Sequence, residues 1–322
     1  MQDKTTASGK HTKEEDLYLF HEVPRILVWN FKGGAGKTST TVGLASALNM
    51  LGYRVIVIDC DAQINSSLYF QQGIGRAQPF TGTLKDYIDG CGDVRAKDLL
   101  RTFTFCRTPG YDGSKDFFFV TEESTEETIP APDIDKAVTR QCTISLIPGD
   151  LNLGASDFSD LETVKRMIEE LTEDYDGKTI VLCDCAPQLV PASNPVLFAG
   201  NRLLVPTLAS NDSIYGIPTV LNIMNEVREA GVDLKLLGLF INNLDMREAV
   251  PKELAVQLRT AVQGTDTYLF DAVVRHSASV EKARSLGIVP LVYEFGKDYQ
   301  TDLVRLALET VNRLIMFDKE VC

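Results

Sequence analysis

A glycine-rich segment at residues 30–39 carries the residues best suited to chemistry. It reads Asn-Phe-Lys-Gly-Gly-Ala-Gly-Lys-Thr-Ser and lies between a short apolar run and a segment of helical period. Glycines let successive backbone N–H groups turn toward one centre, and the N-terminus of the following helix adds partial positive charge. Such a loop holds phosphate oxygens, with Lys37 reaching the β- and γ-phosphates and Thr38 offering a hydroxyl to Mg²⁺. A turn that is merely tight is the alternative, which the Lys-Thr pair disfavours.

The loop departs from the usual phosphate-binding pattern. That pattern, G-x-x-x-x-G-K-S/T, has a glycine where this chain has Phe31, and Lys32 follows at once. Lys32 is therefore a second cation in a loop that already has Lys37 for its own phosphates. A surface lysine without a function is the simpler alternative, but the string K-G-G-x-G-K-T is specific.

Carboxylates follow two apolar runs further along the chain. Asp59 and Asp61 come at the end of the run 55–58, and Asp184 comes at the end of the run 179–183. Residues two apart at a strand end project to the same side. Taken alone, two aspartates after a strand are more often turn-forming residues. The phosphate loop earlier in the chain favours a role at a nucleotide instead.

The elements that position these residues alternate along the chain. Apolar runs at 25–29, 54–58, 179–183, 202–205 and 236–241 suit strands buried on both faces, and helical segments separate them. The segment 37–51 has helical period and stops at Gly52. We therefore expect an α/β fold, a single domain over residues 23–322 with a mostly parallel sheet and helices on both faces. Residues 1–22 are predicted to be a disordered polar tail, and residues 105–140 an inserted surface excursion or a partner-binding loop.

Composition excludes several classes of protein. The 322 residues include 32 basic and 45 acidic side chains, for a formal charge of −13, so any contact with nucleic acid must be a local patch. No apolar run approaches the length of a membrane span, and the first 22 residues lack the apolar core of a secretory signal. We expect a cytoplasmic protein, with association with the nucleoid as a further option. The seven cysteines are odd in number and include no C-x-x-C pair, which indicates reduced thiols.

The phosphate loop resembles the deviant Walker A motif of the ParA/MinD family of dimeric P-loop ATPases. The segment Asp-Cys-Asp-Ala-Gln-Ile-Asn at 59–65 is similar to the family's D-x-D-P-Q-x-N, with Ala62 in place of proline. The segment Asp-Cys-Ala-Pro at 184–187 is similar to its D-x-P-P, with Ala186 in place of one proline. The later stretches 203–207, 238–245 and 274–290 continue the resemblance, which leaves out the tail and the 105–140 insertion.

The resemblance implies a P-loop NTPase fold of the ParA/MinD type, ATP and Mg²⁺ as cofactors, and roles for particular residues. Lys32 reaches the nucleotide of a facing subunit, so two chains sandwich two ATP molecules, and Asp61 holds the attacking water. The implied catalytic residues are Lys32, Lys37 and Asp61. The implied nucleotide-binding residues are Gly33, Gly34, Ala35, Gly36, Lys37, Thr38, Ser39 and Asn242, the last at the adenine. The implied metal ligands are Thr38, Asp59 and Asp184.

Several uses of such an ATPase stay open. Members that resemble ParA bind DNA without sequence preference as ATP dimers, and a ParB-like partner or cargo adaptor stimulates hydrolysis and release. The residues that could form a DNA-binding patch are Arg247, Lys252, Arg259, Arg275, Lys282 and Arg284. The same charges could equally be solvated helix residues. The other candidates are a MinD-like positioning ATPase that acts without DNA and a P-loop metabolic ligase that phosphorylates a small carboxylate.

Membrane recruitment and electron transfer are disfavoured. The apolar face of the last predicted helix, 302–317, lacks the basic border that anionic lipid requires, so we expect it to be core. Iron–sulfur members of the family use paired cysteines at a dimer interface. Cys91, Cys106 and Cys142 lack glycine-rich cluster spacing. Cys60, Cys183 and Cys185 fall near strand ends, and buried thiols explain them better.

Overall fold

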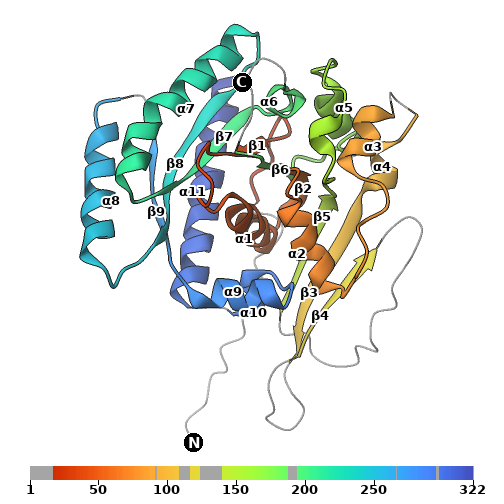
Figure 1. Ribbon diagram of the computed structural model, residues 1–322, viewed down its shortest axis with the longest axis horizontal. Coiled ribbons are helices and arrows are strands. Elements are labelled where there is room, and N and C mark those ends of the chain that lie inside the picture. Colours follow the sequence, from red (N-terminus) through yellow and green to blue (C-terminus); the bar gives the residue numbers. More distant parts are fainter. Residues whose placement is uncertain are drawn as a thin grey trace, which may run out of the picture.

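A nine-stranded sheet forms the centre of the part of the chain that the structure describes (Figure 1). The computed structural model describes residues 17–90, 93–108, 117–123, 140–187, 194–265, 267–294 and 297–321. The strand order is β4-β3-β5-β2-β6-β1-β7-β8-β9. The strands are β1 (Arg25–Val28), β2 (Arg54–Cys60), β3 (Arg101–Thr108), β4 (Phe117–Glu123), β5 (Arg140–Ile147), β6 (Thr179–Cys185), β7 (Arg202–Leu208), β8 (Lys235–Leu244) and β9 (Leu269–Arg275).

Helices pack on both faces of this sheet, which confirms the expected α/β fold class. One face is covered by α1 (Lys37–Met50), α2 (Asn65–Gly73), α10 (Pro290–Tyr293) and α11 (Asp298–Val321). The other is covered by α3 (Leu84–Asp89), α4 (Ala96–Leu99), α5 (Thr163–Leu171), α6 (Pro195–Ala199), α7 (Asn211–Glu229) and α8 (Ala249–Val262). The helix α9 (Ala278–Ser285) follows β9. The central strands have apolar residues on both faces because both faces are covered.

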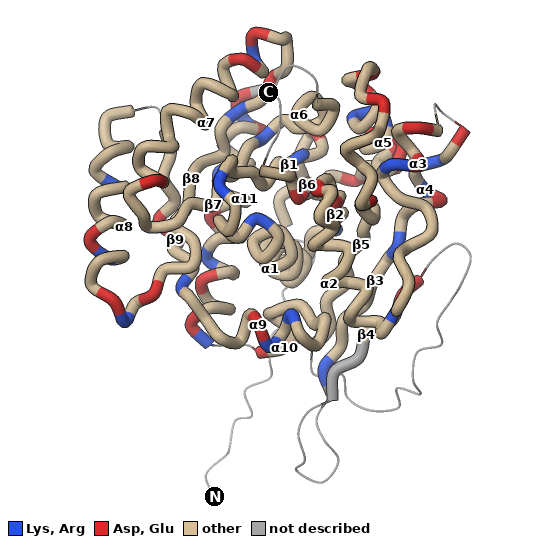
Figure 2. Tube along the Cα trace, viewed as in Figure 1, with Lys and Arg blue, Asp and Glu red and all other residues tan. Residues whose placement is uncertain are grey.

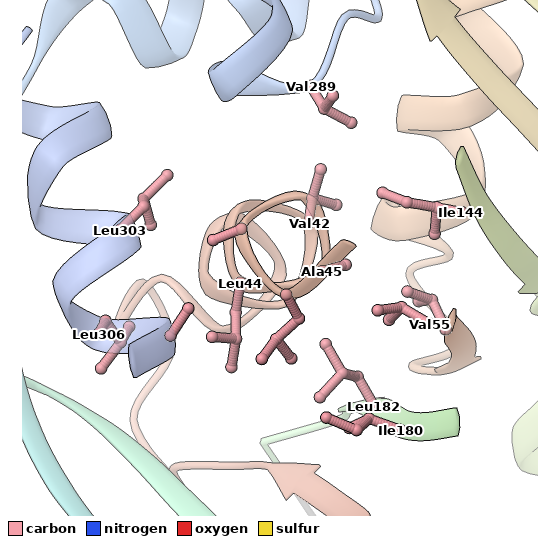
Figure 3. Packing of buried hydrophobic residues seen from close by; sticks show 14 of the residues in the cluster. Val42, Leu44, Ala45, Val55, Ile144, Ile180, Leu182, Val289, Leu303 and Leu306 are labelled. Atoms are coloured by element: carbon pink, nitrogen blue, oxygen red, sulfur yellow. The ribbon is translucent and has the colours of Figure 1, made fainter. Parts of the chain in front are cut away.

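Helix α1 lies inside the core (Figure 3). Side chains from five other segments surround it, and those labelled in the view are Val55, Ile144, Ile180, Leu182, Val289, Leu303 and Leu306. Gly43 permits the close approach of α11, since a Cβ there would lie 2.9 Å from Leu303 Cδ2. The helix begins directly after Gly36 and ends before Gly52, whose φ of 104° confirms the predicted glycine stop. The packing of α1 therefore fixes the position of the loop that precedes it.

The expected tail boundary at residue 22 is wrong for residues 17–22. Phe20 is buried, its ring centroid lies 5.7 Å from that of Tyr53, and its N–H donates to the Gly177 carbonyl at 3.0 Å. The Tyr18 hydroxyl donates to Asp318 at 2.9 Å, which ties this segment to the end of α11. These partners lie far along the chain, so the local polarity of the segment did not indicate them. Residues 1–16 lie outside the described part.

The expected surface excursion at 105–140 also needs correction, because part of it belongs to the sheet. Strands β3 and β4 pair with each other antiparallel, and β3 pairs antiparallel with β5, whereas the other strand pairs are parallel. Phe103 and Phe105 are buried against Phe70, with ring centroids 5.0 and 5.5 Å from it. Residues 109–116 and 124–139 lie outside the described part, so the partner-binding option remains a prediction.

The last helix is core, as expected because its apolar face lacks a basic border. Leu303, Leu306 and Leu314 are all buried in the same core cluster as α1. Among the described residues no helix combines the length and apolar character of a bilayer span. Five cysteines, at 60, 106, 142, 183 and 185, are buried free thiols, while Cys91 and Cys322 lie outside the described residues.

We predict that Leu303→Ala lowers the free energy of unfolding by about 2–5 kcal/mol, because it removes a buried side chain that packs on Gly43 and leaves a cavity. Leu308→Ala on the same helix is the control: this side chain is 47% exposed, and a change within about 0.5 kcal/mol is expected. Urea denaturation of both variants measures the difference. Equal losses of unfolding free energy in the two variants would show that the contact between Leu303 and Gly43 does not hold α11 against α1.

Candidate active site

The phosphate loop occupies the junction between β1 and α1, in the middle of the sheet. Gly34 and Gly36 have φ of 75° and 82°, a left-handed conformation that glycine adopts without strain. Asn30 ties the loop to the next strand, because its amide donates to the Pro206 carbonyl at 2.8 Å and its side-chain oxygen accepts from the Lys32 N–H at 3.0 Å. The N-terminus of a buried helix and a loop of fixed conformation thus face the same space.

A cavity of about 480 Å³ opens at this junction. Its phosphate end is lined by Gly33, Gly34, Gly36, Lys37, Thr38 and Ser39. Loops after β2 and β6 add Asp61, Gln63, Asn65 and Pro187. The rest of the wall is lined by Asn242, Asn243, Arg275, His276, Ser277, Val280, Glu281, Arg284 and Tyr299. The cavity lies outside the carboxyl ends of the parallel strands, where open α/β sheets bind ligands.

The Lys37 side chain lies inside this cavity. The residue is 8% exposed, and its Nζ donates to the Lys32 carbonyl at 3.3 Å. Burial lowers the pKa of the ammonium, while the nearby carboxylates of Asp184 and Asp61 oppose that shift. The cation is therefore held between the loop and the acidic strand ends, where it can meet phosphate oxygens.

Asp184 and Asp59 are register partners on the neighbouring strands β6 and β2, and both are buried. Burial raises the pKa of both carboxyl groups above the usual range of aspartate. Asp184 Oδ2 accepts from the Ser66 hydroxyl at 2.6 Å, whereas its Oδ1 is buried without a hydrogen-bond partner in the described part of the chain. A buried, unpartnered carboxylate oxygen beside the Thr38 hydroxyl suits a hard cation with oxygen ligands, so these residues fit Mg²⁺.

The two aspartates after β2 have different surroundings. Asp61 lines the cavity, and its Oδ1 accepts from the Gln63 N–H at 2.9 Å. Asp59 is directed instead to Ser67 at the start of α2, accepting from its N–H at 2.8 Å and its hydroxyl at 2.7 Å. It also accepts from the Asp61 N–H at 3.3 Å. The geometry therefore gives Asp59 a supporting contact with the turn that carries Asp61, and not a place on the cavity wall.

The turn after Asp61 is held in a strained conformation. Ile64 has a φ of 48°, which a β-branched residue rarely adopts. Its N–H donates to the Asp61 carbonyl at 2.8 Å, and its side chain is buried. Such strain persists only where surrounding contacts hold it, and it often occurs at functional sites.

Lys32 differs from Lys37 in its position. It is not among the described residues that line the cavity, and its Nζ donates to Asp212 Oδ2 at 3.0 Å and to Ser210 Oγ at 3.3 Å. Both acceptors belong to the start of α7. The side chain is 27% exposed. The two lysines of the loop thus have separate environments, one inside the cavity and one against the start of α7.

Asn242 contacts both the loop and the cavity. Its side chain is buried and donates to the Ala35 carbonyl at 2.9 Å, directly over Gly36. The residue thus supports the phosphate loop, and the adenine contact expected of it stays a prediction. Two further residues of the cavity wall, Asn243 and His276, were not predicted from the sequence; they hydrogen-bond each other at 2.9 Å. Their place at the carboxyl ends of β8 and β9, where ligands bind in such sheets, was the feature of the sequence that could have predicted them.

Three of the six residues of the candidate DNA-binding patch pair with carboxylates. Arg247 pairs with Asp245, Arg259 Nη1 lies 3.5 Å from Asp271, and Arg275 Nε donates to Asp302 at 2.7 Å. The other three, Lys252, Lys282 and Arg284, are exposed. Figure 2 shows acidic and basic residues interspersed along α8 and α9. Any field that attracts a phosphate backbone is therefore smaller than the sequence count implies.

Comparison with known proteins agrees with this geometry. A family model described as an AAA domain matches residues 23–236. The chromosome partitioning protein ParA of Caulobacter vibrioides is 26% identical over 295 residues, which cover 89% of this chain and 94% of that protein.

Solved structures share the fold. An ATP complex of a McdA variant from Cyanothece has a TM-score of 0.63 at 18% identity and covers 91% of this chain and 96% of its own. The Mg-ADP complex of the septum site-determining protein MinD from Pyrococcus horikoshii has a TM-score of 0.62 at 19% identity and covers 92% and 99%. The phosphate loop, the cavity and the family match agree, and the chain therefore belongs to the AAA domain family, as a P-loop ATPase of the ParA/MinD type.

Proposed function

We propose that this protein is an ATP-driven dimer switch that positions DNA or another intracellular cargo. Two chains sandwich two ATP molecules, and hydrolysis separates them. The observation that carries this proposal is the separation of the two loop lysines: Lys37 is inside the cavity of its own chain, while Lys32 does not line it and is held against Asp212. A cation in that place is available to the nucleotide of a facing copy, where it stabilises the charge of a transferring phosphoryl group.

Residues of the cavity divide the remaining work. The loop N–H groups and Lys37 hold the phosphates, and the part of the cavity lined by Asn242, Asn243 and His276 takes the nucleoside. The Thr38 hydroxyl and Asp184 hold Mg²⁺, which when bound neutralises phosphate charge. Asp61 orients the attacking water, because its carboxylate is on the cavity wall. Asp59 acts through Asp61 by fixing its turn.

The cargo part of the proposal is binding of DNA without sequence preference by the ATP dimer, with release after a ParB-like partner or cargo adaptor stimulates hydrolysis. The name of the Caulobacter relative supports it. The exposed residues Lys252 and Lys282 contribute, whereas Arg284 lines the nucleotide cavity. Dimerisation doubles their number, which matters for a chain whose formal charge is −13.

We predict that Lys32→Ala abolishes stimulated ATP hydrolysis, with a loss of at least about 100-fold, because no ammonium reaches the facing nucleotide. Binding of ATP by the isolated chain is expected to persist, since Lys32 does not line its own cavity. Lys97→Ala, which removes an exposed lysine on α4, is the control. Full stimulated ATP hydrolysis by the Lys32→Ala variant would contradict the sandwich dimer. ATP turnover that requires only a small carboxylate substrate would instead indicate a metabolic ligase.

We predict that Asp61→Ala traps the ATP dimer, because the nucleotide still binds but the attacking water loses the carboxylate that orients it. Light scattering coupled to size exclusion, in saturating ATP and Mg²⁺, measures the mass of the complex. A monomeric Asp61→Ala protein under these conditions would count against the switch.

DNA binding is predicted to require ATP. A gel shift with DNA of random sequence, in ATP, in ADP and without nucleotide, should show retention with ATP alone. Retention should weaken steeply as salt rises, since the contact is with phosphates. The same weak binding in all three nucleotide states would remove DNA as the cargo.

A further inference from the structure

Helix α2 connects the acidic strand ends to a more distant wall of the nucleotide cavity. Its first turn carries two serines that donate hydrogen bonds to Asp184 and Asp59, and its last residue, Gly73, contacts the segment that ends α9 (Figure 1). We propose that Tyr69 of α2 is a positioning residue, which holds α9 where this helix lines the part of the cavity that takes the nucleoside. The inference rests on the proposed function and adds to it a residue that is not among the described residues of the cavity wall.

Helix α9 continues the part of the wall that the proposed function assigns to the nucleoside. His276 lines the cavity, and the next residue, Ser277, is the N-cap of α9 and lines it too. Within the helix, Val280, Glu281 and Arg284 also line the cavity. These positions are three or four residues apart, so they share one side of the helix. The placement of α9 therefore decides the shape of this part of the cavity.

The end of α9 is a Schellman motif whose glycine lies against α2. The Ile288 N–H donates to the Ala283 carbonyl at 3.0 Å. Gly287, at a φ of 61°, donates its N–H to the Arg284 carbonyl at 2.9 Å. A Cβ at Gly287 would clash with the backbone of Gly73, so no side chain fits between the two segments. The backbone that ends α9 is therefore in direct contact with the last residue of α2.

Tyr69 supplies the buried hydrogen bond of this contact. Its hydroxyl donates to the Ile288 carbonyl at 2.7 Å, and the residue is 5% exposed. Burial raises the pKa of the hydroxyl, and the charges of three residues of the cavity wall also act on it. These three are Tyr299, Arg284 and Glu281. Tyr69 therefore lies close behind the wall, bonded to the chain that ends α9.

The bond from Tyr69 is the one that water cannot replace. A second bond joins the same segments, from Gln72 Nε2 to the Ser285 carbonyl at 2.7 Å, but it is exposed to solvent. A buried carbonyl that loses its donor is unfavourable, whereas an exposed one takes a water molecule instead. Without the Tyr69 hydroxyl, α9 is held less closely and the nucleoside loses part of its wall. The phosphate loop is fixed by the burial of α1 and does not depend on this bond.

The test separates the nucleoside from the phosphates. Isothermal titration calorimetry in Mg²⁺ measures the dissociation constants of ADP and of pyrophosphate, which has the two phosphate groups without the nucleoside. Tyr69→Phe keeps the buried ring and removes only the hydroxyl. It is expected to raise the dissociation constant of ADP about 5- to 10-fold and to leave that of pyrophosphate unchanged. ADP is the probe because, on the proposed function, it is not hydrolysed and does not bring two chains together.

Tyr53→Phe is the matched control. Tyr53 is 2% exposed, and its hydroxyl also donates to a backbone carbonyl, that of Tyr18, at 3.3 Å. It belongs to the same core cluster as Tyr69 but contacts neither α2 nor the end of α9 through this bond. The Tyr53→Phe variant is therefore expected to bind ADP and pyrophosphate as the wild-type chain does.

The outcomes separate this inference from the proposed function. A wild-type chain that binds neither ADP nor pyrophosphate overturns the nucleotide-driven switch itself. A wild-type chain that binds ADP, with the same dissociation constant in Tyr69→Phe, overturns the role of Tyr69 alone. Equal rises for ADP and pyrophosphate in Tyr69→Phe also overturn it, since the hydroxyl then acts on the whole chain and not on the α9 wall. A loss of ADP affinity in Tyr53→Phe as large as that in Tyr69→Phe overturns it for the same reason.

Discussion

The burial of α1 is the constraint on which the rest of the molecule depends. A helix packed on all sides by the sheet, α10 and α11 cannot shift or tilt without opening the core. Its first residue, Lys37, and the glycines before it are therefore held at a fixed distance from the ends of β2, β6 and β8. Phosphate binding by backbone N–H groups needs this rigidity, because the groups must already point at one centre when the ligand arrives.

Electrostatics within the cavity follow from that placement. Two buried aspartates face each other on β2 and β6, and burial raises the pKa of both carboxyl groups. Their ionised forms are unfavourable in such a place without cations nearby. Lys37 supplies one positive charge, and a divalent ion beside Asp184 would supply more. A divalent ion held there would offset the repulsion between these carboxylates and the phosphates of a nucleotide.

Outside the cavity, many basic side chains are neutralised by carboxylates of the same chain. Among the residues that the structure describes, several arginines pair with a nearby carboxylate, which leaves fewer free cations on a chain whose formal charge is −13. The pair of Lys32 and Asp212 is different, because Lys32 directly precedes the loop residues that line the cavity.

The amino-acid sequence by itself determined the phosphate loop, the central strands and the place of Asp61 and Asp184 at strand ends. Those features depend on residue type and local period, and glycine, lysine and apolar alternation carry them within a few positions. Tertiary structure alone decided that Lys32 meets Asp212, that Asn242 supports Ala35 and that Asp59 is directed to Ser67. It also decided that β3 and β4 join the sheet and that Phe20 enters the core. Each of these contacts joins segments whose approach depends on how all the layers pack, so no local pattern could specify them.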